Sequence, residues 1–371
     1  MKRHINPFKI LALAALAIYP ALSHAAGNED GSEKKKTISK SYTIGPNDKL
    51  KIENSFGEVV VNTWDKNEFK IDIEMYAKAK TDERAQYMLD HIKVEDSRSD
   101  NTVHFKTDIH INGGNHNDGD DKDDDGDDDK DDKKNKTVHR HSYTDNQQFH
   151  VNYIVYMPAT NPLYLENSFG KTTVPDFKGP VNLISKFGSL TTGNLDNVEA
   201  VDVEFGSAQI GDVHNGKLTF KFDDKSIIGK LSGSVKVLNE FSGLIQYDVS
   251  SAINELSINS SYSEIRVVVP KELSANFTMH TSFGDFDNNT DFKFSNKSEN
   301  DEDDNMGVHF DKDYTGVAGD GKANIKIKSS FGEVKLSHTA LSREEIEKEH
   351  SEKKERKEKK EKKEKREVEE S

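Results

Sequence analysis

The sequence predicts an all-β protein: a single-stranded β-solenoid, or β-helix, with an N-terminal β-rich block that contains one helix and with a charged C-terminal helix. Two observations carry this prediction. An aromatic residue, in most repeats followed by glycine, recurs from Phe169 to Phe283 at steps of 17 to 21 residues. Before each of these aromatic residues, apolar and polar side chains alternate with the period of a strand. A repeat of about 20 residues is too short for a pair of helices and suits one turn of a β-solenoid.

Each repeat predicts a strand, a corner and a second strand. Side chains two positions apart share a strand face, so we expect the aromatic residues inside, stacked turn on turn. The apolar phase then slips by one residue, as a corner or bulge requires, and glycine adopts unusual backbone angles most readily. The aromatic positions are Phe56, Phe169, Phe187, Phe205, Phe222, Phe241, Tyr262, Phe283 and Phe331, and the corner glycines are Gly57, Gly170, Gly188, Gly206, Gly284 and Gly332.

A small polar residue stands two positions before most of these aromatic residues. On the inward face, such residues are expected to form a hydrogen-bonded ladder that satisfies backbone groups at the corners. They are Asn54, Asn167, Ser185, Asn239, Ser260 and Ser329.

Changes of composition divide the chain into five parts. The last part is almost pure Glu and Lys, with many i,i+4 pairs and no apolar stripe, which predicts a solvated helix. The parts are a signal peptide at 1–25, a disordered leader at 26–40, the N-terminal block at 41–162 with an acidic hairpin insertion at 112–136, the repeats at 163–337 with a second acidic insertion at 292–322, and the charged tail at 338–371.

The N-terminal segment predicts export. It has the basic start, short apolar run and small-residue cleavage site of a secretory signal peptide, with cleavage after Ala25 or Ala26. A transmembrane anchor is the alternative, but the apolar run is shorter than the roughly 20 residues that span a bilayer, and Pro20 interrupts it. We therefore expect a periplasmic, secreted or cell-surface protein with no transmembrane segment in the mature chain.

Charge and cysteine content exclude several kinds of partner and site. The net charge of −15 disfavours nucleic acid and anionic lipid surfaces as partners. The absence of cysteine excludes disulfides and thiolate metal sites.

One helix is expected inside the N-terminal block. Thr81 is the predicted N-cap, and Ala85, Met88, Leu89 and Ile92 follow at helical spacing.

The chain resembles the bacterial adhesin-like repeat proteins, a domain family of unknown function with SFG-type repeats that form a β-helix. The resemblance rests on "KLKIENSFGEVVVNTWDKNEFKIDI" at 49–73, on "VNYIVYMPATNPLYLENSFGKTTV" at 151–174, and on the later SFG-like repeats. It covers roughly residues 41–337. It implies a location in the cell envelope and no known catalytic residues.

The first acidic insertion contains candidate metal ligands. Asp121, Asp123 and Asp125 precede Gly126, and Asp132 stands at the twelfth position, which is the spacing of a calcium loop. Diffuse binding of divalent cations by the dense carboxylates is the alternative interpretation.

Histidines flank the same insertion. His139 and His141 would share one strand face and could ligate zinc or copper, with His104 and His110 on the facing strand. The alternative is an exposed polar face of a hairpin.

No catalytic motif stands out. A carbohydrate-active enzyme on a β-helix would need acids and bases that converge on one exterior face. The candidates are Lys171, Asp176, Asp196, Asp202, Asp212 and Asp223.

The leading hypothesis is a non-enzymatic, adhesin-like protein that binds an envelope or extracellular protein or polysaccharide along its surface. No cofactor is expected beyond Ca²⁺ or another divalent cation at the acidic insertion. That cation defines the main alternative, an envelope cation-binding or cation-sensing protein.

Overall fold

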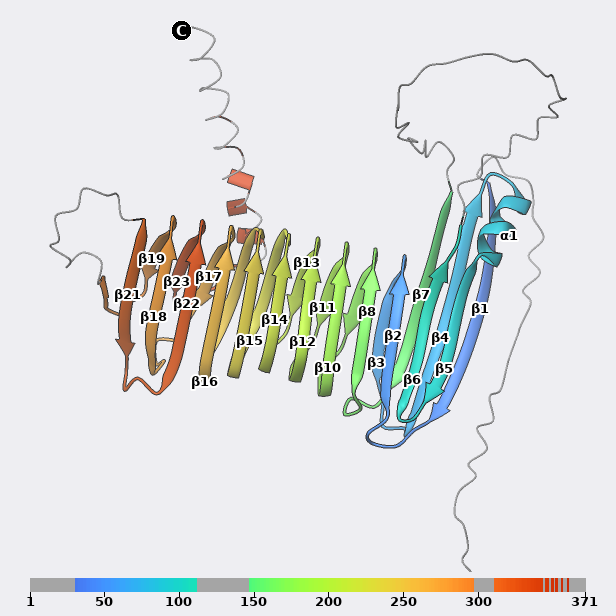
Figure 1. The fold of residues 1–371 in the computed structure, drawn as a ribbon, viewed down its shortest axis with the longest axis horizontal. Helices are drawn as coiled ribbons and strands as arrows, with labels where there is room; N and C mark the ends of the chain where they lie inside the picture. Colours follow the sequence, from blue (N-terminus) through green and yellow to red (C-terminus); the bar gives the residue numbers. More distant parts are fainter. Residues whose placement is uncertain are drawn as a thin grey trace, which may run out of the picture.

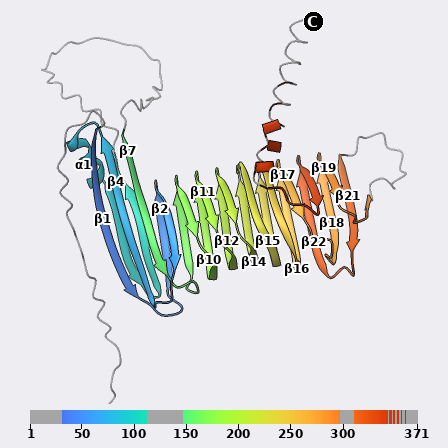
Figure 2. The ribbon, with the colours of Figure 1, turned by 180° about the vertical axis from the view of Figure 1, so that it is seen from behind.

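The structure is a computed structural model that describes residues 31–111, 147–296 and 310–342 and parts of the C-terminal helix between 344 and 359. The described chain is nearly all β, and its 23 strands join into one large sheet. The strands stand side by side in a long row, with the N-terminal block at one end and β18 and β21 at the other (Figures 1 and 2). The predicted signal peptide and the first acidic insertion lie outside the described residues.

The N-terminal block begins with β1, where the sequence predicts a disordered leader up to residue 40. This prediction is wrong from Ser32 onward, because β1 pairs with β4 along its whole length in antiparallel register. The polar composition of β1 gives no strand signal in the sequence, because the strand is stabilised by backbone pairing with β4. The strands of the block are β1 (Ser32–Thr43), β2 (Lys49–Ser55), β3 (Val59–Thr63), β4 (Glu68–Ala79), β5 (Ile92–Ser99), β6 (Thr102–Ile109) and β7 (Gln148–Met157).

The expected helix is confirmed as α1 (Asp82–Asp90). The Thr81 side chain accepts a hydrogen bond from the backbone N–H of Arg84, which satisfies one of the free donors of the first turn. Met88 and Leu89 are buried and attach the helix to the block.

After the block, successive turns of the chain stack in parallel register. Every described pairing among β8 to β17 is parallel, and each strand up to β15 pairs with the equivalent strand one repeat later. The strands are β8 (Leu163–Ser168), β9 (Lys171–Val174), β10 (Phe177–Lys186), β11 (Ser189–Thr192), β12 (Leu195–Glu204), β13 (Ser207–Ile210), β14 (Val213–Lys221), β15 (Lys225–Glu240), β16 (Leu244–Ser261) and β17 (Glu264–Val268).

At the C-terminal end the spatial order departs from the sequence order. β22 lies between β16 and β18, with parallel pairing on both sides, and β21 then pairs antiparallel with β18. β20 and β21 fall inside the region predicted as an acidic insertion at 292–322, so parts of that segment form strands. The strands are β18 (Ala275–Ser282), β19 (Asp285–Asn289), β20 (Phe294–Asn296), β21 (Asp311–Ala318), β22 (Ala323–Ser330) and β23 (Glu333–Ser337).

The interior follows the predicted alternation. The apolar residues before and after each corner are buried, as Leu50, Ile52 and Val59 show in the first repeat. The small polar residues also face inward: the Asn54 amide donates to the Asn167 side-chain oxygen at 3.0 Å, and Asn167 donates to the Gly57 carbonyl at 3.1 Å. The ladder is only partly hydrogen-bonded, because the described contacts leave the buried hydroxyls of Ser185, Ser260 and Ser329 without a partner.

The aromatic residues of the repeats lie outside, which corrects the expectation that they fill the core. Phe56, Phe187 and Phe205 are 38%, 49% and 48% exposed, and the other members of the series are similarly exposed. The cause is their backbone. Each adopts a left-handed conformation, with φ between 50° and 59°, and so breaks the strand alternation at the aromatic residue itself. The phase slip is real, but it occurs one residue earlier than expected.

The corner glycines are needed because the backbones of neighbouring repeats approach closely there, and not because the glycines adopt unusual backbone angles. None of them is among the described residues with positive φ. A Cβ on Gly170 would lie 1.8 Å from the Gly57 oxygen, and a Cβ on Gly188 would lie 1.9 Å from the Gly170 oxygen. Those carbonyls point across the turns, where the Ser189 N–H donates to the Gly170 oxygen at 3.2 Å. Gly206, Gly284 and Gly332 repeat this arrangement.

Candidate interaction surface

The outward aromatic residues form a continuous stack along one edge of the molecule, which we call the aromatic ladder. Neighbouring ring centroids are 4.4–5.3 Å apart and their planes differ by at most 18°. Phe149 packs against the first ring at 5.1 Å in a tilted arrangement. In spatial order the rings are Phe149, Phe56, Phe169, Phe187, Phe205, Phe222, Phe241, Tyr262, Phe331, Phe283 and Phe310.

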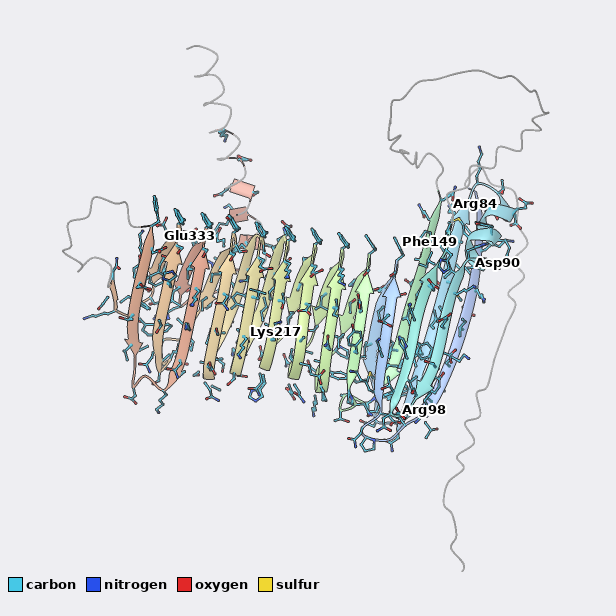
Figure 3. The ribbon with its side chains drawn as sticks, in the orientation of Figure 1. Arg84, Asp90, Arg98, Phe149, Lys217 and Glu333 are labelled. Atoms are coloured by element: carbon cyan, nitrogen blue, oxygen red, sulfur yellow. The ribbon has the colours of Figure 1, made fainter. Side chains whose placement is uncertain are left out.

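The ladder runs along the edge between the labelled Phe149 and Glu333, where side chains project beyond the strand ends (Figure 3). Backbone hydrogen bonds hold each rung in register: the N–H of Phe187 donates to the Glu204 oxygen at 2.9 Å, and that of Phe205 donates to the Lys221 oxygen at 2.9 Å. The widest step, 5.3 Å, separates Phe222 and Phe241, whose corners both have an extra residue before the next strand. The sheet therefore sets the spacing of the rings.

Stability alone does not explain why these positions are aromatic. A left-handed backbone costs a residue with a side chain about 1–2 kcal/mol. Stacking contributes about 0.5–1.5 kcal/mol per aromatic pair, so the two effects roughly offset one another. Asparagine tolerates the left-handed region better and would turn the corner with a polar side chain. An aromatic side chain with a solvent-exposed edge at each corner therefore indicates a role other than stability.

The exposed apolar area of the ladder is large. With about half of each ring accessible, each contributes on the order of 100 Å², and the whole ladder contributes about 1,000 Å². The largest apolar patch on a typical monomer is about 300–600 Å², and larger patches mark interaction sites. The ladder thus has the size of a binding surface.

A row of alternating charges borders the middle of the ladder. The residues directly before four consecutive rings are Lys186, Glu204, Lys221 and Glu240, and each lies opposite the next in the strand register. Lys221 and Glu240 form an ion pair at 3.2 Å, with about a third of each side chain exposed. Lys186 pairs with Glu166 at 3.0 Å.

On its other side the ladder borders a shallow groove of about 250 Å³. Lys171 and Lys225 contribute its positive charge, and Ile346 from the C-terminal helix contributes to its wall. None of the described residues that line this groove carries a carboxylate. The lining also includes Ser189, Leu190, Thr191, Ser207, Ala208, Gln209 and Ile227.

The start of the charged tail is anchored beside the ladder. Ser342 and Glu345 form a reciprocal capping box, in which the Ser342 N–H donates to the Glu345 carboxylate at 2.7 Å and the Glu345 N–H donates to the Ser342 hydroxyl at 3.3 Å. Gln246 exchanges two hydrogen bonds with the backbone of Leu341. Ile346 is 1% exposed. The tail therefore begins as a docked helix.

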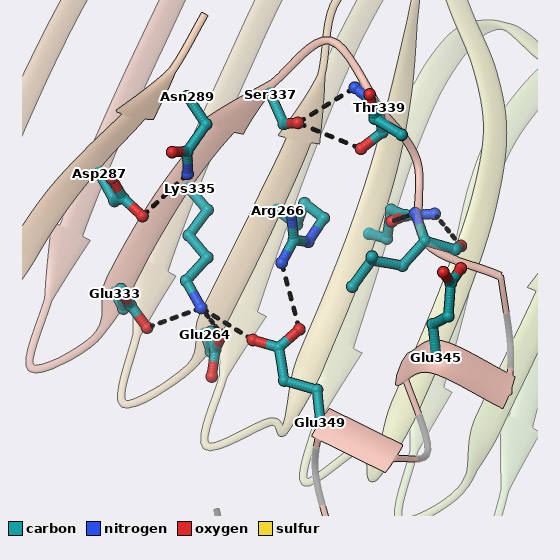
Figure 4. Close-up of polar contacts among 12 residues, drawn as sticks. Glu264, Arg266, Asp287, Asn289, Glu333, Lys335, Ser337, Thr339, Glu345 and Glu349 are labelled. Carbon is teal, nitrogen blue, oxygen red and sulfur yellow. Dashed lines mark hydrogen bonds and ion pairs between the residues drawn. The ribbon is translucent and has the colours of Figure 1, made fainter.

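An ionic cluster completes this anchor (Figure 4). Glu349 accepts from Arg266 at 3.2 Å and from Lys335 at 2.9 Å, and Lys335 also pairs with Glu264 and Glu333. Burial by itself would lower the pKa of Lys335, but the surrounding carboxylates raise it above its usual value, so the ammonium stays charged. The cluster ties the helix to β17 and β23.

The predicted metal ligands of the first acidic insertion stay a prediction. Asp121, Asp123, Asp125, Asp132, His139 and His141 lie outside the described residues. On the described side of the hairpin, His104 pairs with Glu53 at 2.5 Å, and His110 pairs with Asp108 at 2.9 Å. Among the residues that the structure describes, no group of three or more His, Asp or Glu could hold a metal ion.

The acids proposed for catalysis do not converge on one groove. Asp176 and Asp212 act at another corner, where each carboxylate accepts a backbone N–H from the following repeat, from Asn194 at 2.7 Å and from Lys230 at 2.9 Å. Asp223 is buried at a corner and accepts from the Ser226 hydroxyl. These roles are structural.

Comparisons with known proteins place the chain among distant structural likenesses. No protein-family model matches the sequence, and no curated protein matches it. A candidate cell adhesion protein from Clostridium sporogenes is similar at 13% identity over 82% of this chain and 99% of its own, with a TM-score of 0.22.

Candidate adhesins from Bacteroides fragilis and Parabacteroides distasonis are similar at 10% and 11% identity. They cover 81% and 83% of this chain and 97% and 98% of their own, with TM-scores of 0.33 and 0.28. At these TM-scores, the three structures do not establish a function for this chain. Within the described residues, no helix is long and apolar enough to cross a membrane.

Proposed function

We propose that the protein is a non-enzymatic, adhesin-like binding or structural protein of the cell envelope, exported and built as a single-stranded β-solenoid. The observation that carries this proposal is the aromatic ladder, about 1,000 Å² of apolar surface in a straight line. Parallel stacking of successive repeats supports the solenoid, because each turn buries its apolar face against its neighbours.

The shape of the ladder favours a partner that is held by many similar contacts. Each ring offers a small apolar edge, and a line of such edges fits an extended or repetitive surface better than a compact ligand. The groove beside the ladder is lined by hydroxyl, amide, apolar and lysine side chains, with no carboxylate among its described lining to act as an acid or base.

Asparagine substitutions in the ladder test the proposal. The triple variant Phe187→Asn, Phe205→Asn, Phe222→Asn keeps residues that tolerate the left-handed corners while it removes three exposed rings. Binding of the purified protein to isolated envelopes and intact cells is measured by sedimentation. We expect the triple variant to bind at least about tenfold more weakly, since hot-spot aromatic residues dominate interfaces.

A matched control removes exposed apolar side chains elsewhere. Ile154 and Val317 are 44% and 61% exposed and lie outside the ladder, so Ile154→Thr with Val317→Thr should bind like the unmodified protein. Equal binding by the ladder variant and the control variant would count against the ladder as the binding surface.

Cation binding by the acidic insertion stays a prediction of the sequence. Calorimetry with Ca²⁺ and Zn²⁺, on the intact chain and on a chain without residues 118–132, tests it. Equal heats from the two proteins would remove this alternative.

A further inference from the structure

We propose that the partner of the aromatic ladder is a second copy of the same chain. The two ladders pack edge to edge and antiparallel, about a two-fold axis that passes between Phe205 and Phe222. This inference rests on the proposed function, because it takes the ladder as the surface that binds.

The chemistry of the exposed rings favours an apolar partner over one that stacks. Ring planes in the ladder from Phe56 to Phe283 differ by at most 8°, so the interior rings have both faces covered by neighbouring rings. A sugar or a nucleobase needs a free ring face, and such faces are already occupied. Only ring edges are accessible, and a row of edges packs against another apolar row.

The spacing of the ladder favours a partner with the same repeat. All but one of the steps between Phe56 and Phe283 measure 4.7–4.9 Å, which is the spacing of strands in a sheet. A partner that contacts ring after ring must repeat at that distance over the whole length. A second copy has the same spacing, and in the antiparallel pair its one wider step, Phe222 to Phe241, faces the Phe187 to Phe205 step of the first copy.

The area is sufficient for a stable pair. A standard interface buries about 800 Å² on each partner. The ladder alone offers about 1,000 Å² per copy, before its charged borders are counted. Two-fold dimers are the commonest assemblies, and their interface presents the same patch twice.

The charged border fixes the direction of the pairing. The charges of Lys186, Glu204, Lys221 and Glu240 alternate in sign along the ladder. When the direction of the ladder is reversed, each position therefore carries the opposite sign. In an antiparallel pair centred between Phe205 and Phe222, Lys186 faces Glu240 of the second copy and Glu204 faces its Lys221. All four charges then meet an opposite charge across the interface.

The remaining surroundings agree with this arrangement. The C-terminal helix is held at β17 and β23 on the opposite border, so in the antiparallel pair these two strands face β9 and β3 of the second copy.

Sedimentation velocity on the full-length protein gives the first test. We expect dimers at micromolar concentration, and at least a tenfold weaker dimer for the triple variant Phe187→Asn, Phe205→Asn, Phe222→Asn. Circular dichroism of each variant shows that its fold is kept. A protein that stays monomeric up to about 100 μM would overturn the inference.

Cross-linking with a short bis-maleimide tests the geometry, because the chain has no cysteine and each introduced thiol is unique. Ser207→Cys lies next to the two-fold axis and should cross-link to itself. Ser55→Cys should not, because its equivalent lies seven steps away, or about 34 Å at the strand spacing. A mixture of Ser55→Cys and Ser330→Cys should cross-link, since these positions face one another.

The outcomes separate the two proposals. Self-cross-linking of Ser55→Cys would indicate parallel ladders and overturn the antiparallel pair. A monomeric protein that loses envelope binding in the triple variant refutes the dimer and keeps the proposed function. A dimer with no envelope binding supports the pairing and counts against the adhesive role.

Discussion

Replacing Gly188 by alanine tests why the repeats contain glycine. The φ of Gly188 is not left-handed, so conformational freedom alone predicts that alanine stabilises the protein by about 0.4–1 kcal/mol. The structure predicts the opposite sign. The new Cβ would lie 1.9 Å from the Gly170 oxygen, so the two turns must separate by more than 1 Å, roughly, to reach ordinary contact.

The separation has a calculable cost. It breaks the hydrogen bond from Ser189 N–H to the Gly170 oxygen and weakens the one from Ser207 N–H to the Gly188 oxygen, both 3.2 Å long. It also loosens the stacking of Phe169 on Phe187. At about 1 kcal/mol per hydrogen bond and about 1 kcal/mol for the stack, the expected loss is between about 1 and about 3 kcal/mol.

Equilibrium urea unfolding followed by circular dichroism measures this loss. Hydrogen exchange at the Ser189 amide reports whether the damage is local. Gly45→Ala is the matched control, because a Cβ there meets nothing within 4 Å, and we expect it to change stability by less than about 0.5 kcal/mol. A Gly188→Ala protein as stable as the control would refute the close-approach argument.

Three further substitutions follow from polar groups that hold parts of the structure together. Burial raises the pKa of Asp223 from 3.8 to about 6, so the unfolded chain loses this proton first and stability falls as the pH rises from about 4 to about 6. Asp223→Asn should remove that loss, up to about 3 kcal/mol at pH 7, and parallel urea-unfolding profiles of the two proteins from pH 4 to 8 would contradict it. Glu349→Gln should release the C-terminal helix from Lys335, seen as faster hydrogen exchange in that helix, whereas the exposed Glu352→Gln should change nothing. Asn167→Ala should cost about 2–3 kcal/mol in urea unfolding, because it removes one of the hydrogen bonds of Asn54 and the side-chain donor of the Gly57 carbonyl, and a neutral result would show that the polar ladder is dispensable.

The strand alternation and the repeat spacing were sufficient to predict the β architecture. Residues such as Leu165, Leu183 and Val201 occupy equivalent inward positions because a period of two fixes the face of each side chain. The helix after Thr81 was also predictable, since its cap and apolar spacing are local. Local patterns therefore carried most of the fold.

The sequence does not reveal that the aromatic residues lie outside, because the strand alternation ends one residue before each of them. Asn54 is inward, and Phe56, two positions later, would be inward on a continuous strand. The left-handed backbone at Phe56 turns the chain there. The phase slip showed that one residue breaks the alternation, but alternation cannot distinguish Phe56 from Gly57. The glycine requirement arises from carbonyls of another repeat, which a single repeat does not reveal.

The position of β22 between β16 and β18 also constrains the order in which the chain can assemble. Repeats up to β17 can add one after another as the chain emerges, because each finds its partner already in place. β18 cannot, because its parallel neighbour begins 48 residues further along, at Ala323. The C-terminal end must therefore wait for almost the whole chain, because β18 is joined to the preceding repeats only through β22. Any export machinery that delivers the chain from its N-terminus would release a molecule whose last turns are still open.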